Sequence, residues 1–283
     1  VFDTKAVLPA DLLQSTDFRL APETTVKEYQ FQFEMETKFG IFAVSGIPLL
    51  ERRILELRAI ERAISLSNEP VALKAAWTTL KKTPQGASHL LTDPKGTLTA
   101  APRGLKRWAE SFVNPVDRRV GSASKRRLAA NLGVDSETRN PALAKLLNEL
   151  SARKFVGDTA TGLTLGAVLP GLGLLAPAED FRQQVANQNP HEVLQQINAE
   201  LTQLGVWPPA REEFVASNRW TLVEKLTFVN FYQQLAGIEH ADVMIYLANQ
   251  DQTETDILQR LISMQLLVEL HSQSPIKTIS NSG

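Results

Sequence analysis

Helical periodicity dominates the chain from Ser122 onward and most constrains its fold. Apolar residues recur there three and four positions apart, and polar residues fill the positions between them. This spacing places the apolar side chains along one stripe of an α-helix, so it predicts a domain of packed helices. The clearest stripes are Leu143, Leu146, Leu147 and Leu150, followed by Leu194, Ile197, Leu201 and Leu204.

The expected helix ends carry their own signals. Asn140-Pro141 and Asn189-Pro190 each place a capping residue before a proline that fits the first helical turn. Gly133 and Gly205 each stand in a Leu-Gly-Val triplet, where glycine can end a helix. Three later helices are predicted over Thr221 to Ala236, Ala241 to Ala248 and Thr253 to His271. Because the last is apolar around most of its circumference, we expect it at the centre of the helical domain.

The N-terminal region has a different pattern. Residues 1–25 show no sustained period, which indicates an irregular arm. Residues Val26 to Met35 alternate between apolar and polar side chains, as in a half-buried strand. A turn near Gly40 and an apolar run from Ile41 to Val44 complete a predicted β-hairpin. The expected inner face of the first strand consists of Tyr29, Phe31, Phe33 and Met35.

An amphipathic helix is predicted over Pro48 to Leu66, packed on the hairpin, since a two-stranded sheet alone is marginally stable. Its expected polar side holds Glu51, Arg52, Arg53, Glu56, Arg58 and Glu61. The predicted fold class is therefore mainly α, with an N-terminal β-hairpin packed on helices, followed by a multi-helix C-terminal domain. The expected divisions are the arm (1–25), the hairpin with a basic helical segment (26–128), an acidic helical domain (129–274) and a tail (275–283).

Charge is distributed unevenly although the net charge is only −1. Residues 71–127 carry 12 basic and 3 acidic residues, whereas residues 179–283 carry 6 basic and 13 acidic residues. Such asymmetry suggests either that the two segments face each other within the fold or that the basic segment binds an anionic partner. The sequence leaves both alternatives open.

The basic segment repeats the unit Pro-x-Gly at positions 84, 94 and 102. Each unit fits a type I turn or a helix start, so we expect residues 84–108 to be ordered as short helices and turns. A second helix beginning near Pro70 precedes them, and a basic amphipathic helix around Trp108 follows. Candidate binding residues are Lys106, Arg107, Trp108, Arg118, Arg119, Lys125, Arg126 and Arg127.

The chemistry of these residues suits an anionic membrane surface or an acidic protein. Basic amphipathic helices that carry tryptophan are a common interfacial design. Nucleic acid is a poorer fit because the segment contains no recognised nucleic-acid motif, and its aromatic residues fall on helical apolar stripes.

Residues 159–178 form an uncharged run that contains Gly162 and Gly166. Its length matches a membrane span, yet Pro170-Gly171 would break a helix near its middle. We therefore expect a buried helix followed by a tight turn. A binding site for a small apolar ligand and insertion at a membrane interface remain alternatives, and no confident transmembrane span is expected.

Evidence for catalysis is weak. The chain has no cysteine, which excludes disulfides and thiolate chemistry. It also lacks a Walker loop, a dinucleotide fingerprint and a nucleophile elbow, so no cofactor is expected. His240 and Asp242 are the only candidates, and weak ones, for a metal or for a carboxylate–histidine enzyme site.

The resulting functional hypothesis is a non-catalytic binding or scaffold protein that uses its basic segment. The chain begins at Val1 rather than at methionine, as a protein does after losing an export signal. We therefore expect a periplasmic or extracellular, membrane-peripheral protein, with a cytoplasmic location left open. A helical module for a small apolar ligand and an enzyme around His240 are the alternative functions.

Overall fold

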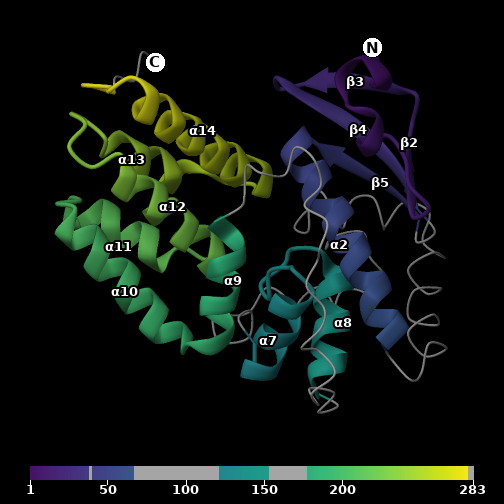
Figure 1. Cartoon of the computed structure of the whole chain (residues 1–283), viewed down its shortest axis with the longest axis horizontal. Coiled ribbons are helices and arrows are strands. Elements are labelled where there is room, and N and C mark those ends of the chain that lie inside the picture. The colour runs from purple at the N-terminus through teal and green to yellow at the C-terminus, as the bar shows by residue number, and fades with distance from the viewer. Residues whose placement is uncertain (38–39, 67–120, 153–176, 280–283) are drawn as a thin grey trace. The chain divides into compact units, whose positions relative to one another are not determined.

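A computed structural model describes residues 1–37, 40–66, 121–152 and 177–279 (Figure 1). The chain folds into two compact units, Val1–Thr164 and Leu165–Gly283. The first unit contains an antiparallel sheet and helices, and the second is helical, which confirms the predicted mainly-α class. The domain boundary predicted between residues 128 and 129 falls within helix α7 (Ala123–Asn131).

The sheet of the first unit is organised around its longest strand, β4 (Gln30–Thr37). Strand β5 (Gly40–Ser45) pairs along one side of β4, and the register ends with Thr37 opposite Gly40. This pairing confirms the predicted hairpin near Gly40. The other side of β4 pairs first with β3 (Glu23–Lys27) and further along with β2 (Phe18–Leu20).

The predicted irregular arm over residues 1–25 is wrong, because the segment contributes three strands to this sheet and also forms two short helices. Besides β2 and β3 it contains β1 (Phe2–Asp3), which pairs with β3, and two short helices, α1 (Thr4–Val7) and η1 (Ala10–Leu12). The three strands are only 2, 3 and 5 residues long. Segments this short do not complete enough periods of two to be recognised from their pattern.

The predicted strand from Val26 to Met35 is correct only in its second part. Glu28 and Tyr29 have positive φ values of 51° and 62° and form the two-residue connection between β3 and β4. Two consecutive positive φ angles are typical of a type I′ hairpin turn. Tyr29 therefore stands fully exposed in the turn rather than on the inner face, whereas Phe33 and Met35 are buried as predicted.

Helix α2 (Ile47–Leu66) confirms the amphipathic helix expected after the hairpin and packs against β5 (Figure 1). Its apolar residues Leu50, Ile54 and Ile60 are almost completely buried. The predicted polar side is wrong at three positions, because Glu51, Arg53 and Glu56 are buried as well.

Helices α7 and α8 (Pro141–Ala152) pack against each other and use the end signals expected from the sequence. Gly133 has φ 71° after α7, and Val134 N–H donates to the Ala129 carbonyl, as in a Schellman C-cap. Asn140 Oδ1 accepts from the backbone N–H groups of Ala142 and Leu143 and so caps the N-terminus of α8.

The second unit is a bundle in which α12 is the central helix. Its helices are α9 (Pro177–Asn187), α10 (Pro190–Gln203), α11 (Pro208–Ala216), α12 (Leu222–Gln234), α13 (Val243–Gln250) and α14 (Glu254–Gln273). Ten of the 13 residues of α12 are buried, and the helix contacts α9, α10 and α14. The prediction that the last helix is central is wrong, because only four residues of α14 are buried while Leu266 and Leu270 are exposed.

The described part of the predicted tail is held in place. Glu239 N–H donates to the Lys277 carbonyl, and Ile279 N–H donates back to the Glu239 carbonyl. The Thr278 hydroxyl adds a hydrogen bond to the Glu239 carboxylate at 3.0 Å. Residues 277–279 therefore pair with the loop that precedes α13.

Several predicted features lie outside the described residues. They are the helix near Pro70, the Pro-x-Gly region over 84–108, the helix around Trp108 and residues 159–176 of the uncharged run. Among the helices that the structure describes, none combines the length and the apolar character needed to cross a membrane.

Replacing Gly205 by alanine should lower the free energy of unfolding by about 1 kcal/mol. Gly205 has φ 73°, and a Cβ added there would meet no atom within 4 Å, so the cost is backbone strain alone. Chemical denaturation can measure it. Gly205→Asn is the control, because asparagine tolerates this conformation better, and equal losses for both variants would contradict the explanation.

Candidate functional site

The predicted basic binding surface is only partly described. Lys106, Arg107, Trp108, Arg118 and Arg119 lie outside the described residues. The remaining three members, Lys125, Arg126 and Arg127, follow one another on helix α7. Their side chains differ in exposure.

Lys125 does not belong to an exposed surface, which corrects its place in the predicted set. Its side chain is buried, and burial lowers the pKa of the ammonium group, while the acidic groups of Glu137 and Asp135 partly offset that effect. Arg126 is half-buried and donates from Nη1 to the Gly121 carbonyl at 2.8 Å. Arg127 is exposed and is the described member of the set that best fits a surface role.

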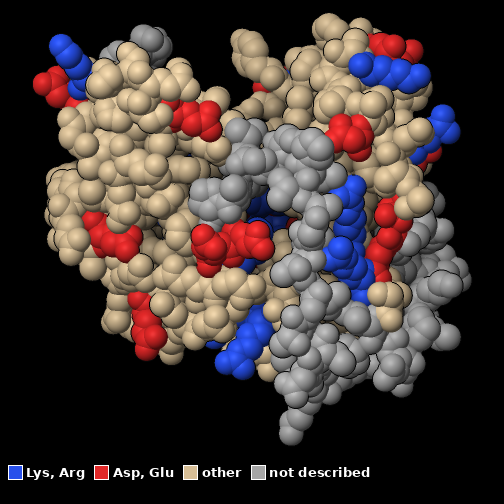
Figure 2. Space-filling view, viewed as in Figure 1, with Lys and Arg blue, Asp and Glu red and all other residues tan. Residues whose placement is uncertain are grey.

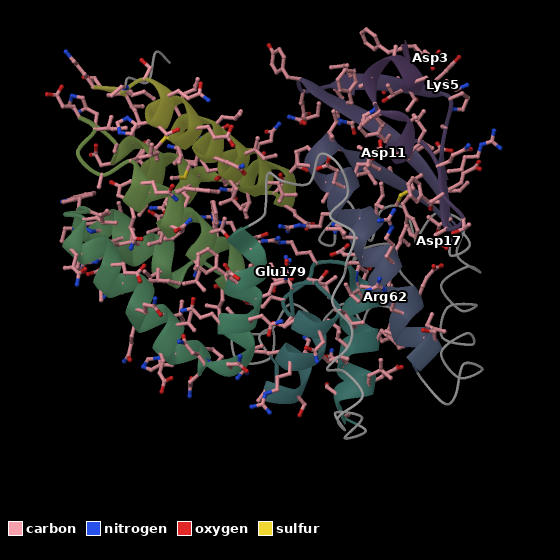
Figure 3. All side chains as sticks on the ribbon, viewed as in Figure 1. Asp3, Lys5, Asp11, Asp17, Arg62 and Glu179 are labelled. Carbon is pink, nitrogen blue, oxygen red and sulfur yellow. The ribbon has the colours of Figure 1, made fainter. Side chains whose placement is uncertain are left out.

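Two arginines of α2 extend the basic character of this unit and were not singled out from the sequence. Arg58 and Arg62 are four residues apart, so they lie on the same helical face, and both are half-buried. Neither guanidinium forms a hydrogen bond or an ion pair within the part of the chain that the structure describes. Figure 2 shows Lys and Arg side chains following α2, and Figure 3 labels Arg62. The only sign of this pair in the sequence is the spacing of four residues between Arg58 and Arg62.

A buried polar network joins α2 to the loop before α8. Glu56 Oε2 accepts from Arg53 Nη1 at 2.7 Å and from Asn140 Nδ2 at 3.1 Å. Glu56 Oε1 accepts from the Thr138 hydroxyl at 2.5 Å. Because a buried charge is costly unless it is paired and hydrogen-bonded, these contacts are needed for the fold. The burial of Arg53, Glu56 and Asn140 is therefore explained by a stabilising role and gives no evidence of a catalytic or binding role.

Glu51 is a carboxyl group whose buried environment changes its ionisation. It is 7% exposed, and burial together with the nearby Asp11 raises its pKa to about 7. Asp11 belongs to η1, which Figure 3 shows near the N-terminal end of α2. Perturbed carboxyl groups are common at functional sites, although structural burial produces the same shift.

The weak metal candidates have no third ligand among the residues that the structure describes. His240 and Asp242 are both exposed, and His240 has a positive φ of 62° in the turn before α13. Within the described ranges no group of three or more His, Asp and Glu residues could hold a metal ion. Of the other histidines, His271 accepts a hydrogen bond at Nδ1 from Ile276 N–H, which is a structural role.

Comparison with known proteins gives no further guide. No protein-family model matches the chain, and neither a curated protein nor a solved structure matches it. The function must therefore be argued from the residues themselves.

Proposed function

We propose that the protein is a non-catalytic binding or scaffold protein whose basic residues engage an anionic surface or an acidic partner. The observation that carries the proposal is the excess of 12 basic over 3 acidic residues in positions 71–127. The guanidiniums of Arg58 and Arg62, which pair with no group in the described ranges, support it, because they add basic groups to the same unit. An exported, membrane-peripheral location belongs to the same proposal.

The physical basis is long-range attraction between opposite charges. Each Lys or Arg close to an anionic lipid surface contributes about 1 kcal/mol, so several are needed for stable binding. Arg58 and Arg62 suit this role because a guanidinium binds phosphate and carboxylate oxygens with two parallel hydrogen bonds. The attraction fades within about 8 Å at physiological salt, so binding should weaken steeply as ionic strength rises.

The proposal predicts that joint replacement of Lys106, Arg107, Arg118 and Arg119 by glutamine weakens binding at least about tenfold, since about 1 kcal/mol is lost per charge. A second variant, Arg58→Gln with Arg62→Gln, should weaken it by a smaller factor. Co-sedimentation with phosphatidylcholine vesicles that contain phosphatidylglycerol measures both effects. Soluble polyglutamate, tested in parallel, separates an acidic polypeptide from a lipid surface.

Lys145→Gln is the matched control, because this surface lysine already lies 3.8 Å from Glu149 and should change binding little. Thermal unfolding of every variant should stay close to that of the wild type. If the quadruple variant unfolds instead, its basic residues are partners of acidic residues within the chain, and the proposal fails. Undiminished binding by that variant would also contradict it.

A further inference from the structure

Two large aromatic side chains are exposed on adjacent helices of the second unit. Trp207 immediately precedes α11 and is 66% exposed, and Tyr246 of α13 is 58% exposed. Helices α11 and α13 pack against each other (Figure 1). Tryptophan and tyrosine are enriched among the residues that dominate the energy of protein interfaces, so two of them on joined helices need an explanation.

One hydrogen bond fixes how the two helices meet. Asn249 Nδ2 donates to the Ala210 carbonyl at 2.9 Å, which joins the C-terminal part of α13 to the first turn of α11. Tyr246 lies three residues before Asn249, and Trp207 lies three residues before Ala210. Each aromatic residue therefore lies within about one helical turn of a residue that this bond joins, so both stand close to the α11–α13 junction.

The same junction holds two buried polar atoms without a partner among the described residues. Asn249 is 8% exposed, and its Oδ1 is a buried acceptor that receives no hydrogen bond. Arg211 follows Ala210 directly, and its Nε is a buried donor that makes no hydrogen bond. A buried polar atom left unpaired costs about 1–3 kcal/mol, so each such atom in a folded protein calls for an explanation, such as strain, an ordered water or a bound group.

We propose that the α11–α13 junction, defined by Trp207, Ala210, Arg211, Tyr246 and Asn249, binds a segment of a partner polypeptide. A main-chain amide offers one N–H and one C=O, which are the groups that Asn249 Oδ1 and Arg211 Nε lack. The two aromatic side chains provide apolar contact area for a bulky side chain of the same segment.

The charge of the second unit indicates that this segment is basic. Glu212, Glu213 and Asp242 are exposed on or beside α11 and α13. Several of the unit's basic groups are already engaged: Lys225 Nζ donates to the Val215 and Ser217 carbonyls, and Arg260 pairs with Asp251 at 3.0 Å. The three carboxylates outnumber the half-buried guanidinium of Arg211, so they favour Lys and Arg next to the apolar anchor, and these cations also interact well with aromatic rings.

The α11–α13 junction lies in the second unit, whereas the basic residues proposed above lie in the first. The two proposals are therefore independent. Vesicle binding should survive loss of Trp207, and peptide binding should survive the quadruple glutamine variant. Failure of one therefore leaves the other standing.

The proposal can be tested by selecting peptides that bind the full chain from a random phage-displayed library. The affinity of each selected peptide is then measured with a synthetic copy by titration calorimetry. Most selected peptides should carry a bulky apolar residue next to Lys or Arg. Trp207→Ala and Tyr246→Ala should each weaken their binding at least about tenfold, as expected for anchor residues. Arg211→Lys, which keeps the charge but removes the Nε group, should weaken it by a smaller factor.

Tyr29→Ala is the matched control, because Tyr29 is a fully exposed aromatic residue of the other unit. It should leave peptide affinity unchanged, and thermal unfolding confirms that the Trp207 and Tyr246 variants remain folded. If selected peptides bind both variants as tightly as the wild type, or if no peptide is recovered, the junction is not a binding site. The unpaired atoms are then satisfied by water alone.

Discussion

Replacing Glu56 by glutamine is expected to lower the free energy of unfolding by about 3–5 kcal/mol, the usual cost of breaking a buried ion pair. Arg53 is only 2% exposed, and its guanidinium lies 2.7 Å from the Glu56 carboxylate. Glutamine has almost the same shape but no charge, so the buried guanidinium loses the negative charge beside it. The same change weakens the hydrogen bonds from Thr138 and Asn140, which join α2 to the start of α8.

Chemical denaturation of the variant and the wild type measures this loss. Glu149→Gln is the control, since it breaks an exposed pair with Lys145 and should cost about 1 kcal/mol or less. Replacing both members of the buried pair, Arg53→Met with Glu56→Leu, should recover only part of the loss, because neither charge is then left alone but Thr138 and Asn140 still lose their acceptor. A loss for Glu56→Gln no larger than that for Glu149→Gln would contradict the structural role of the network.

The helices were predictable because their signals are local. Asn140 and Asn189 accept hydrogen bonds from backbone N–H groups two residues ahead, and Gly133 and Gly205 have the positive φ that ends a helix. Each of these contacts spans only a few residues, so the sequence around it contains all the information. The β4–β5 hairpin was predictable for the same reason.

The buried network was not predictable, because its partners are distant in sequence. Thr138 and Asn140 lie 82 and 84 residues from Glu56, and only the packing of α2 on α8 brings them together. The pattern of α2 alone places Glu56 on a polar face. The position of the helix is therefore predictable from the sequence, but the burial of its charged residues is not.

The prediction that α14 is the central helix was wrong for a related reason. Composition reports how apolar a helix is but not how many neighbours surround it. Helix α12 contains buried Glu224 and Lys225, whose polar groups are satisfied by the cap at Thr221 and by the Val215 and Ser217 carbonyls. Helix α14 looks more apolar, yet its C-terminal half carries exposed leucines. Burial of α12 depends on hydrogen bonds that a hydrophobic pattern does not report.

The candidate sites share this dependence on long-range packing. Nothing in the sequence relates Trp207 to Tyr246, and only the packing of α11 on α13, with the bond from Asn249 to the Ala210 carbonyl, places both near one junction. The basic segment, in contrast, was evident from a count of charges. The net charge of a segment can be read from sequence, whereas a surface formed where two helices meet requires the fold.

The stability of the protein should fall as pH rises from about 4.5 to about 7, because Glu51 must lose its proton inside the fold. Burial is the larger cause that raises its folded-state pKa from 4.5 to about 7, and the charge of Asp11 adds to it. The stability contributed by protonated Glu51 is fully present below the unfolded pKa of 4.5 and is lost as pH rises through about 7. The total loss is about 3–4 kcal/mol, since each pKa unit corresponds to about 1.4 kcal/mol.

Glu51→Gln removes this dependence, because the amide is neutral at every pH. Denaturation at a series of pH values should show the variant more stable than the wild type above pH 7 by about 3–4 kcal/mol, and close to it below pH 4.5. Asp11→Asn should recover only a minor part of the stability lost above pH 7, because burial, and not the charge of Asp11, is the main cause of the raised pKa of Glu51. Glu34→Gln, at an exposed position of β4, is the control and should follow the wild-type profile. A constant difference between Glu51→Gln and the wild type across the series would mean that Glu51 is already ionised in the folded protein, and that a partner stabilises its charge.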